Sequence, residues 1–130
     1  MEPVPAQILS FEEVNILGNI LNNTFGKAST QDKGYSVKHS LQGSKLVLKY
    51  NAIVHFNDTD GLTTQKKEEE RISSQMLDDK IADTKREFRE QAGRALKVEK
   101  LRERDEVEVI SMTSSRKIAY YRRFITFEIS

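Results

Sequence analysis

The two histidines are the first candidates for chemistry, because an imidazole can bind a metal ion or transfer a proton near neutral pH. His39 and His55 each stand at an alternating position in a segment with the pattern of a strand, and no acidic residue at ligand spacing lies beside them. The chain has no cysteine, which excludes thiol catalysis and cysteine-ligated zinc or iron. The sequence therefore predicts packed or exposed strand histidines, no metal site and no cofactor.

Asp58, Asp60 and Gly61 resemble the start of a calcium-binding loop. That loop requires a glycine at its sixth position and a bidentate glutamate at its twelfth. Counted from Asp58, the twelfth residue is Glu69, but the sixth is Thr63. The segment 58–61 is therefore predicted to be a turn.

Other catalytic patterns are missing as well. The glycines are isolated, so no phosphate-binding loop is predicted, and no serine lies in a nucleophile-elbow sequence. Adjacent acidic pairs such as Asp78 and Asp79 lie among cations and have the character of a solvated helix face. We expect the protein not to be an enzyme, since an active site would have to be assembled from polar residues by the fold alone.

One local concentration of charge stands out near the end of the chain. Between Ser114 and Ser130 there are four cationic residues against one anionic residue, a net charge of +3, and two tyrosines interleave with them. This mixture suits a solvated or subunit-facing strand, a protein interface, or nucleic-acid binding, and we rank them in that order. The candidate interface residues are Arg116, Lys117, Tyr120, Tyr121, Arg122 and Arg123.

A short amphipathic helix is predicted between the cap residue Ser10 and the stop residue Gly26. Ser10 and Glu13 have the spacing of a capping box, in which two side chains satisfy backbone N–H groups at the start of a helix. Gly26 supplies a stop signal. The positions that recur at helical spacing are Phe11, Val14, Leu17 or Gly18, Leu21 and Phe25.

Two segments have the alternation of β-hairpins. Tyr35–Phe56 turns at 42–44, and each of its strands has one apolar and one polar face. The second hairpin has a third strand at Val107–Met112, after the charged run Lys100–Asp105, and a fourth strand at Ile118–Ile129. One solvent-exposed face on each strand is typical of an antiparallel sheet.

A long charged helix is predicted between the hairpins, over Gln65–Leu96, with Gly93 as an alternative end. About 30 helical residues make a rod of about 45 Å, whereas a compact domain of this size has a radius of gyration of about 14 Å. One end of the rod is thus expected to project. The predicted fold class is α+β, a two-layer α-β-β-α-β-β sandwich with one short and one long helix on an antiparallel sheet.

Length and composition fit a single domain covering residues 1–130. The net charge of +1 gives no overall attraction to nucleic acid or to an anionic membrane. Residues 1–10 lack a basic region, and no apolar run approaches the about 20 residues that span a bilayer. We expect a soluble protein without a signal peptide and without a membrane partner.

Three short motifs carry a resemblance to a protein family. Gly93–Lys97 (GRALK), Val109–Met112 (VISM) and Ala119–Arg123 (AYYRR) resemble segments of small structural proteins of contractile-tailed bacteriophages, the myoviruses. The resemblance covers roughly the C-terminal third of the chain. It implies a virion component of the capsid, neck or tail, found in the virion or in the host cytoplasm during assembly.

The expected function is therefore that of a non-enzymatic structural or assembly protein. Its partners would be other structural proteins, copies of itself, or both. The alternative is a small α+β nucleic-acid-binding module that uses the basic and aromatic last hairpin.

Overall fold

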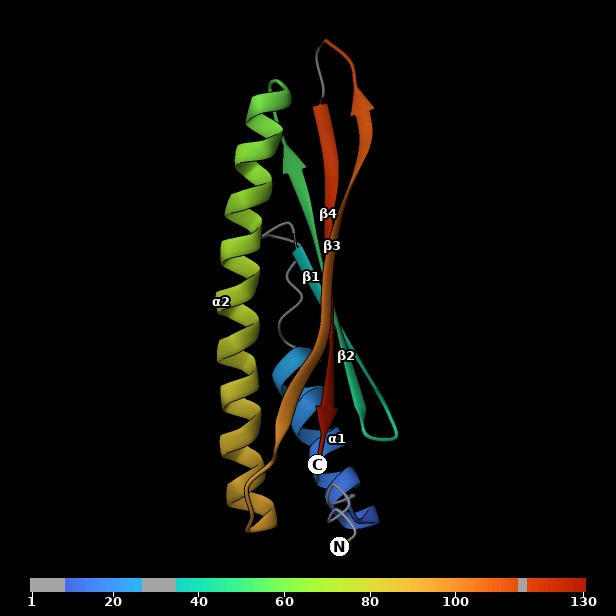
Figure 1. Cartoon of the computed structure of the whole chain (residues 1–130), viewed down its shortest axis with the longest axis vertical. Coiled ribbons are helices and arrows are strands. Elements are labelled where there is room, and N and C mark those ends of the chain that lie inside the picture. The colour runs from blue at the N-terminus through green and yellow to red at the C-terminus, as the bar shows by residue number, and fades with distance from the viewer. Residues whose placement is uncertain (1–8, 27–34, 115–116) are drawn as a thin grey trace, which may run out of the picture.

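The computed structural model describes residues 9–26, 35–114 and 117–130. Two helices and four strands follow one another in the order α-β-β-α-β-β (Figure 1). The elements are α1 (Phe11–Gly26), β1 (Tyr35–Gln42), β2 (Lys45–His55), α2 (Thr59–Ala92), β3 (Val98–Met112) and β4 (Lys117–Ile129). The strands form one antiparallel sheet in the order β1-β2-β4-β3, which confirms the predicted α+β fold class.

Helix α1 begins with the predicted capping box. The backbone N–H of Ser10 donates to Oε1 of Glu13 at 2.9 Å, and the backbone N–H of Glu13 donates to Oγ of Ser10 at 3.2 Å. The buried face consists of Leu17, Ile20, Leu21 and Phe25. Phe11 is 82% exposed, so the predicted apolar stripe is wrong at its first position. The packed part of the helix starts later.

The start of α2 corrects the sequence prediction. Oδ1 of Asp58 accepts a hydrogen bond from the backbone N–H of Gly61 at 2.6 Å, so Asp58 is the N-cap and the helix begins at Thr59 rather than at Gln65. Segment 58–61 is therefore the cap and first turn of the helix, not a separate turn. An aspartate favours both structures because its short carboxylate reaches nearby backbone N–H groups in each.

The end of α2 follows the alternative prediction. Gly93 adopts a left-handed conformation with φ of +76°, and its N–H donates to the carbonyl of Arg89 at 3.1 Å. Glycine populates this region without the steric cost of a Cβ atom. The helix thus ends at Ala92, and the predicted end at Leu96 is wrong.

Strand β3 begins at Val98 rather than at Val107, so the charged run Lys100–Asp105 belongs to a strand. Strand β4 is paired with β2 on one side, and β3 supplies hydrogen-bond partners along its other side. An edge strand tolerates charged side chains, and they protect its free edge from pairing with another chain. Tertiary pairing thus overrides the polar composition of this segment.

The molecule is elongated, and the long helix matches the length of the sheet. The 34 residues of α2 rise over about 51 Å, and the 15 residues of β3 extend over about 50 Å. Figure 1 shows α2 running along the sheet from the region of the β3–β4 hairpin to the region of α1. The prediction that one end of α2 projects past the sheet is wrong, because the strands of the β3–β4 hairpin are about as long as the helix.

The hydrophobic core lies between the sheet and the two helices. Residues at alternate positions of β2 and β4, such as Leu48 and Ile125, pack with Leu21 of α1 and with Leu77 and Phe88 of α2. The same alternation leaves the opposite side of the sheet uncovered by any described element. We call that side the open face.

Candidate functional site

The predicted interface residues of β4 divide between the two sides of the sheet. Tyr121 and Arg123 are buried on the helix side, with 0% and 8% exposure, whereas Tyr120 and Arg122 alternate onto the open face. Arg116 lies outside the described residues. The six residues therefore do not form one continuous surface in the described part of the chain, and their role as an interface remains a prediction.

Lys117 begins β4 at one end of the sheet. With His55 and Asp58 it lines a polar surface pocket of about 600 Å³ beside the first turn of α2. The carboxylate of Asp58 already caps that helix end. His39 is half-buried on β1, its Nε2 lies 3.1 Å from Oδ1 of Asn22 in α1, and burial lowers its pKa. Each histidine thus lies in a strand, as predicted.

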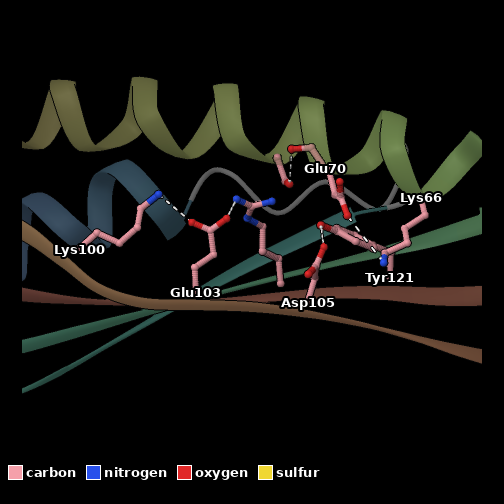
Figure 2. Close-up of polar contacts among 8 residues, drawn as sticks. Lys66, Glu70, Lys100, Glu103, Asp105 and Tyr121 are labelled. Carbon is pink, nitrogen blue, oxygen red and sulfur yellow. Dashed lines mark hydrogen bonds and ion pairs between the residues drawn. The ribbon is translucent and has the colours of Figure 1, made fainter.

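A layer of polar contacts connects α2 to the last two strands (Figure 2). We call this group the polar layer; it consists of Glu70 from α2, Glu103 and Asp105 from β3, and Tyr121 and Arg123 from β4. The register explains the grouping, because Asp105 pairs with Arg123 and neighbouring helix-side positions hold Glu103 and Tyr121. Apart from Tyr121, these residues line a surface pocket of about 530 Å³ between helix and strand.

Tyr121 is tied to β3 through its hydroxyl group. The hydroxyl donates a hydrogen bond to Oδ2 of Asp105 at 3.1 Å. Burial, followed by the charge of Asp105, raises the pKa of Tyr121 well above its ordinary value. Tyr50 on β2 makes a parallel contact with α2, donating to Oε2 of Glu69 at 2.7 Å. Both phenols are therefore held neutral and oriented by carboxylates.

Arg123 forms an ion pair with Glu103, which is also paired with Lys100 at 2.7 Å. The guanidinium is almost completely buried, and this burial lowers the pKa of Arg123, while its Nε has no hydrogen-bond partner. A charge taken out of water needs a close counter-ion to offset its desolvation. Glu103 is that counter-ion, and Lys100 continues the chain of charges to the surface.

The carboxyl groups of Glu70 and Asp105 interact directly. A hydrogen bond from one to the other raises the pKa of Glu70, and burial raises it further, while Lys66 at 3.8 Å opposes the shift. A carboxyl group ionises less readily when a second carboxyl group lies beside it. Over residues 9–26, 35–114 and 117–130, no group of three or more His, Asp or Glu residues is arranged to hold a metal ion.

The open face carries aromatic rings with cations over them. Arg104 of β3 and Lys49 of β2 both lie over the ring of Phe124, with Cζ at 4.4 Å and Nζ at 5.6 Å from its centre. Arg122 lies 5.2 Å from the ring centre of Tyr120. Its guanidinium also donates to Oε2 of Glu108 at 2.6 Å. The open face is thus a mixed surface of rings and charges.

Exposed apolar side chains gather at one end of the sheet. We call this group the apolar end; it consists of Ile53 on β2 and of Val109, Ile110 and Met112 on β3. Their exposed fractions are 46%, 45%, 48% and 62% in that order. The register places Ile53 beside Tyr120 on the open face, whereas Val109 beside Ala119 and Met112 beside Lys117 lie on the helix side. The pair of Met112 with Lys117 lies beyond the last pair of β2 with β4, so the apolar end is the tip of the sheet with apolar residues on both of its sides.

Sequence reasoning missed the polar layer and the apolar end. The signal for the first was a pair of charged residues at successive inward positions of β3, Glu103 and Asp105, the second of which pairs with Arg123. It was hidden because the charged run was not recognised as part of β3. The apolar end could not be recognised from the sequence. Alternation along a strand indicates which residues share a face, but it does not indicate which part of that face the helices cover.

No helix in the described ranges is long and apolar enough to cross a membrane. No protein-family model, curated protein or solved structure matches this chain.

Proposed function

We propose that this chain is a non-enzymatic structural protein that assembles through the apolar end of its β3–β4 hairpin. The observation that carries the proposal is the set of exposed apolar residues Val109, Ile110 and Met112 close together on the end of β3, with Ile53 on the other side of the same end of the sheet. Single exposed apolar residues are common on soluble proteins, but a group of them marks an interaction surface. Four of the seven large apolar residues exposed in the described ranges belong to this group.

The β3 edge of the sheet favours side-chain packing over strand addition. Strand β3 is irregular in register between Lys100 and Arg102 and again between Val109 and Ser111, and most of its length is charged. Bulges and charges are the devices by which edge strands avoid pairing with another chain. At the apolar end the exposed side chains of β3 are uncharged, so charge does not protect this part of the strand from contact with another chain.

A second copy of this chain is the proposed occupant of the apolar end. Two apolar ends can bury each other in a symmetric contact, since such an interface uses the same surface on both subunits. Four side chains cover much less than the about 800 Å² per partner of a standard interface, so a single contact is weak. Association is then expected to depend on protein concentration and to persist in high salt, because apolar contacts are not screened.

The polar layer supports the non-enzymatic part of the proposal. Its phenol, guanidinium and carboxyl groups are engaged with one another across α2, β3 and β4. Polar networks of this kind hold structural elements together and fix their arrangement. We therefore assign these residues to holding the long helix on the hairpin.

The role of the apolar end is tested by a matched pair of charge insertions. Ile110→Asp places a carboxylate in the apolar end, and Leu101→Asp does the same at an equally exposed site (48% in both cases) at the other end of β3. Sedimentation equilibrium over a range of protein concentrations is expected to show association for the wild type and for Leu101→Asp, but not for Ile110→Asp. Equal association of all three would overturn the assignment.

The resemblance of the motifs GRALK, VISM and AYYRR to myovirus structural proteins supports a more specific proposal, that the chain is a virion component. Such a protein is present in purified particles at a fixed ratio to the other structural proteins. Quantitative mass spectrometry of density-purified particles from the source phage tests this. Absence from the particles, with abundance in the lysate, would contradict the virion proposal and leave self-association to be judged by sedimentation.

A further inference from the structure

A row of cations crosses the open face at its centre. Lys38 pairs in register with Lys49, Lys49 with Phe124, and Phe124 with Arg104, so these four residues lie side by side across all four strands. We call Lys38, Lys49 and Arg104 the cationic row. With neighbouring strands about 4.8 Å apart, it extends over about 14 Å.

The rows on either side strengthen the positive charge. One holds Arg102 beside Thr126, and the other holds Arg122 beside Glu106. The three central rows thus contain five cations and one anion on the open face. The net charge of the whole chain is only +1, so this surface is a local concentration that composition does not reveal.

The cations at the centre are largely without carboxylate partners. In the described ranges, Lys38, Lys49 and Arg102 make no ion pair, and Arg104 approaches Glu106 only at 3.6 Å. Their charges are therefore available to a ligand. Arg122 differs, because it is already paired with Glu106 and Glu108.

Aromatic rings lie among these cations. Phe124 is flanked by Arg104 and Lys49, and Tyr120 lies two positions along the same strand with Arg122 over it. Both rings are half-buried, so each keeps an exposed part. Rings and guanidinium planes on a positively charged surface can stack nucleobases while the cations neutralise phosphates.

We propose that the open face binds single-stranded nucleic acid, with phosphates at the cationic row and bases stacked at Phe124 and Tyr120. An acidic protein segment would use the charges but gain little from the rings. A duplex would present its phosphates but keep its bases stacked out of reach. The combination of cations and rings therefore favours an unpaired strand.

The test is fluorescence anisotropy of the wild-type chain with a labelled oligothymidylate of about 15 nucleotides, between about 50 and 200 mM salt. The variant Lys38→Ala/Lys49→Ala/Arg104→Ala is expected to bind on the order of tenfold to a hundredfold more weakly. Its slope of log affinity against log salt should be smaller by about 2, since each phosphate contact to a single strand contributes about 0.7. Phe124→Leu should weaken binding on the order of tenfold.

A second triple variant, Lys67→Ala/Lys85→Ala/Arg89→Ala, removes three exposed cations from α2 and serves as the matched control. It is expected to bind like the wild type. Circular dichroism and thermal melting establish that every variant is folded.

Three results would overturn the proposal. The first is no binding by the wild type at low salt, and the second is an equal loss in both triple variants, which would show non-specific attraction. The third is competition by poly-glutamate at an equal charge concentration as effective as by the oligonucleotide, which would assign the face to acidic proteins. The apolar end is tested separately by Ile110→Asp, because the variants used here leave its four residues unchanged, although Ile53 is the register neighbour of Tyr120.

Discussion

The hydroxyl of Tyr121 donates to Oδ2 of Asp105 at 3.1 Å, across two paired strands and beneath the long helix. Tyr121 is fully buried, and Asp105 also contacts Glu70 of α2. One phenol therefore connects β4 to β3 and, through a shared carboxyl, to the helix. This relationship accounts for charged residues on the inner side of an edge strand.

Removing the Tyr121 hydroxyl should destabilise the fold. Tyr121→Phe leaves Asp105 short of a donor in a half-buried position, and we expect a loss of about 1 kcal/mol in the free energy of unfolding. Tyr120→Phe is the control, because Tyr120 lies on the open face and its hydroxyl makes no hydrogen bond in the described structure. Urea unfolding should show a change within about 0.5 kcal/mol for the control. Equal changes for the two variants would contradict the account of the polar layer.

The pair of Glu70 and Asp105 should make stability depend on pH. The pKa of Glu70 is raised above its ordinary value of 4.5, so the folded state binds its proton more tightly than the unfolded chain does. The resulting stabilisation is complete below the unfolded pKa and is lost as the pH rises through the folded pKa. Glu70→Gln imitates the protonated form permanently. Its stability relative to the wild type should rise from pH 4 to pH 8.

The matching control is Glu90→Gln, an exposed position elsewhere on α2. Chemical denaturation at several pH values measures both variants against the wild type. A relative stability of Glu70→Gln that stays flat, or that falls as the pH rises, would show that the fold does not raise the pKa of Glu70.

The contact of Glu13 with Arg94 has the opposite dependence on pH. The Arg94 side chain, followed by the backbone N–H of Ser10, lowers the pKa of Glu13 from 4.5 to about 2. Its stabilisation is present above the unfolded value of 4.5 and is lost as the pH falls towards 2. Glu13→Gln should therefore lower the melting temperature at pH 6 and have little effect at pH 2. A melting-temperature difference that does not change with pH would rule out the ion pair as its cause.

Two phenylalanines provide a test of the core. Phe88 on α2 is completely buried, and Phe88→Ala should lower the free energy of unfolding by about 3 to 5 kcal/mol because it removes apolar contacts and leaves a cavity. Phe11→Ala makes the same change at a side chain that is 82% exposed and should cost less than about 0.5 kcal/mol. Guanidinium unfolding monitored by circular dichroism distinguishes the two. A large cost at Phe11 would mean that α1 packs differently.

The fold was largely predictable from the sequence where local signals agree with tertiary packing. The capping box at Ser10 and the alternation of β2 are such signals, and both hold in the structure. Prediction failed at Val98–Glu106, where strand formation depends on pairing with β4 rather than on composition. It also failed at Asp58, because a carboxylate that caps a helix has the same local signature as one in a turn.

The candidate surfaces were less predictable than the fold. The prediction placed Tyr120 and Tyr121 in one interface, although consecutive residues of a strand point to opposite sides of the sheet, and in the structure Tyr121 is buried while Tyr120 lies on the open face. The cationic row joins Lys38 to Arg104 across four strands, and only the register brings them together. A surface made from residues far apart in sequence depends on the order of the strands in the sheet. That order cannot be predicted from any single segment of the sequence.

The central claim is that the chain assembles through its own surface at the apolar end. The most direct measurement is the native mass by light scattering after size exclusion, over a range of protein concentrations, at low and at high salt. We predict a mass that increases with concentration towards a defined oligomer and that is maintained in high salt. A monomer at every concentration would contradict the claim, as would an oligomer that dissociates when salt is raised.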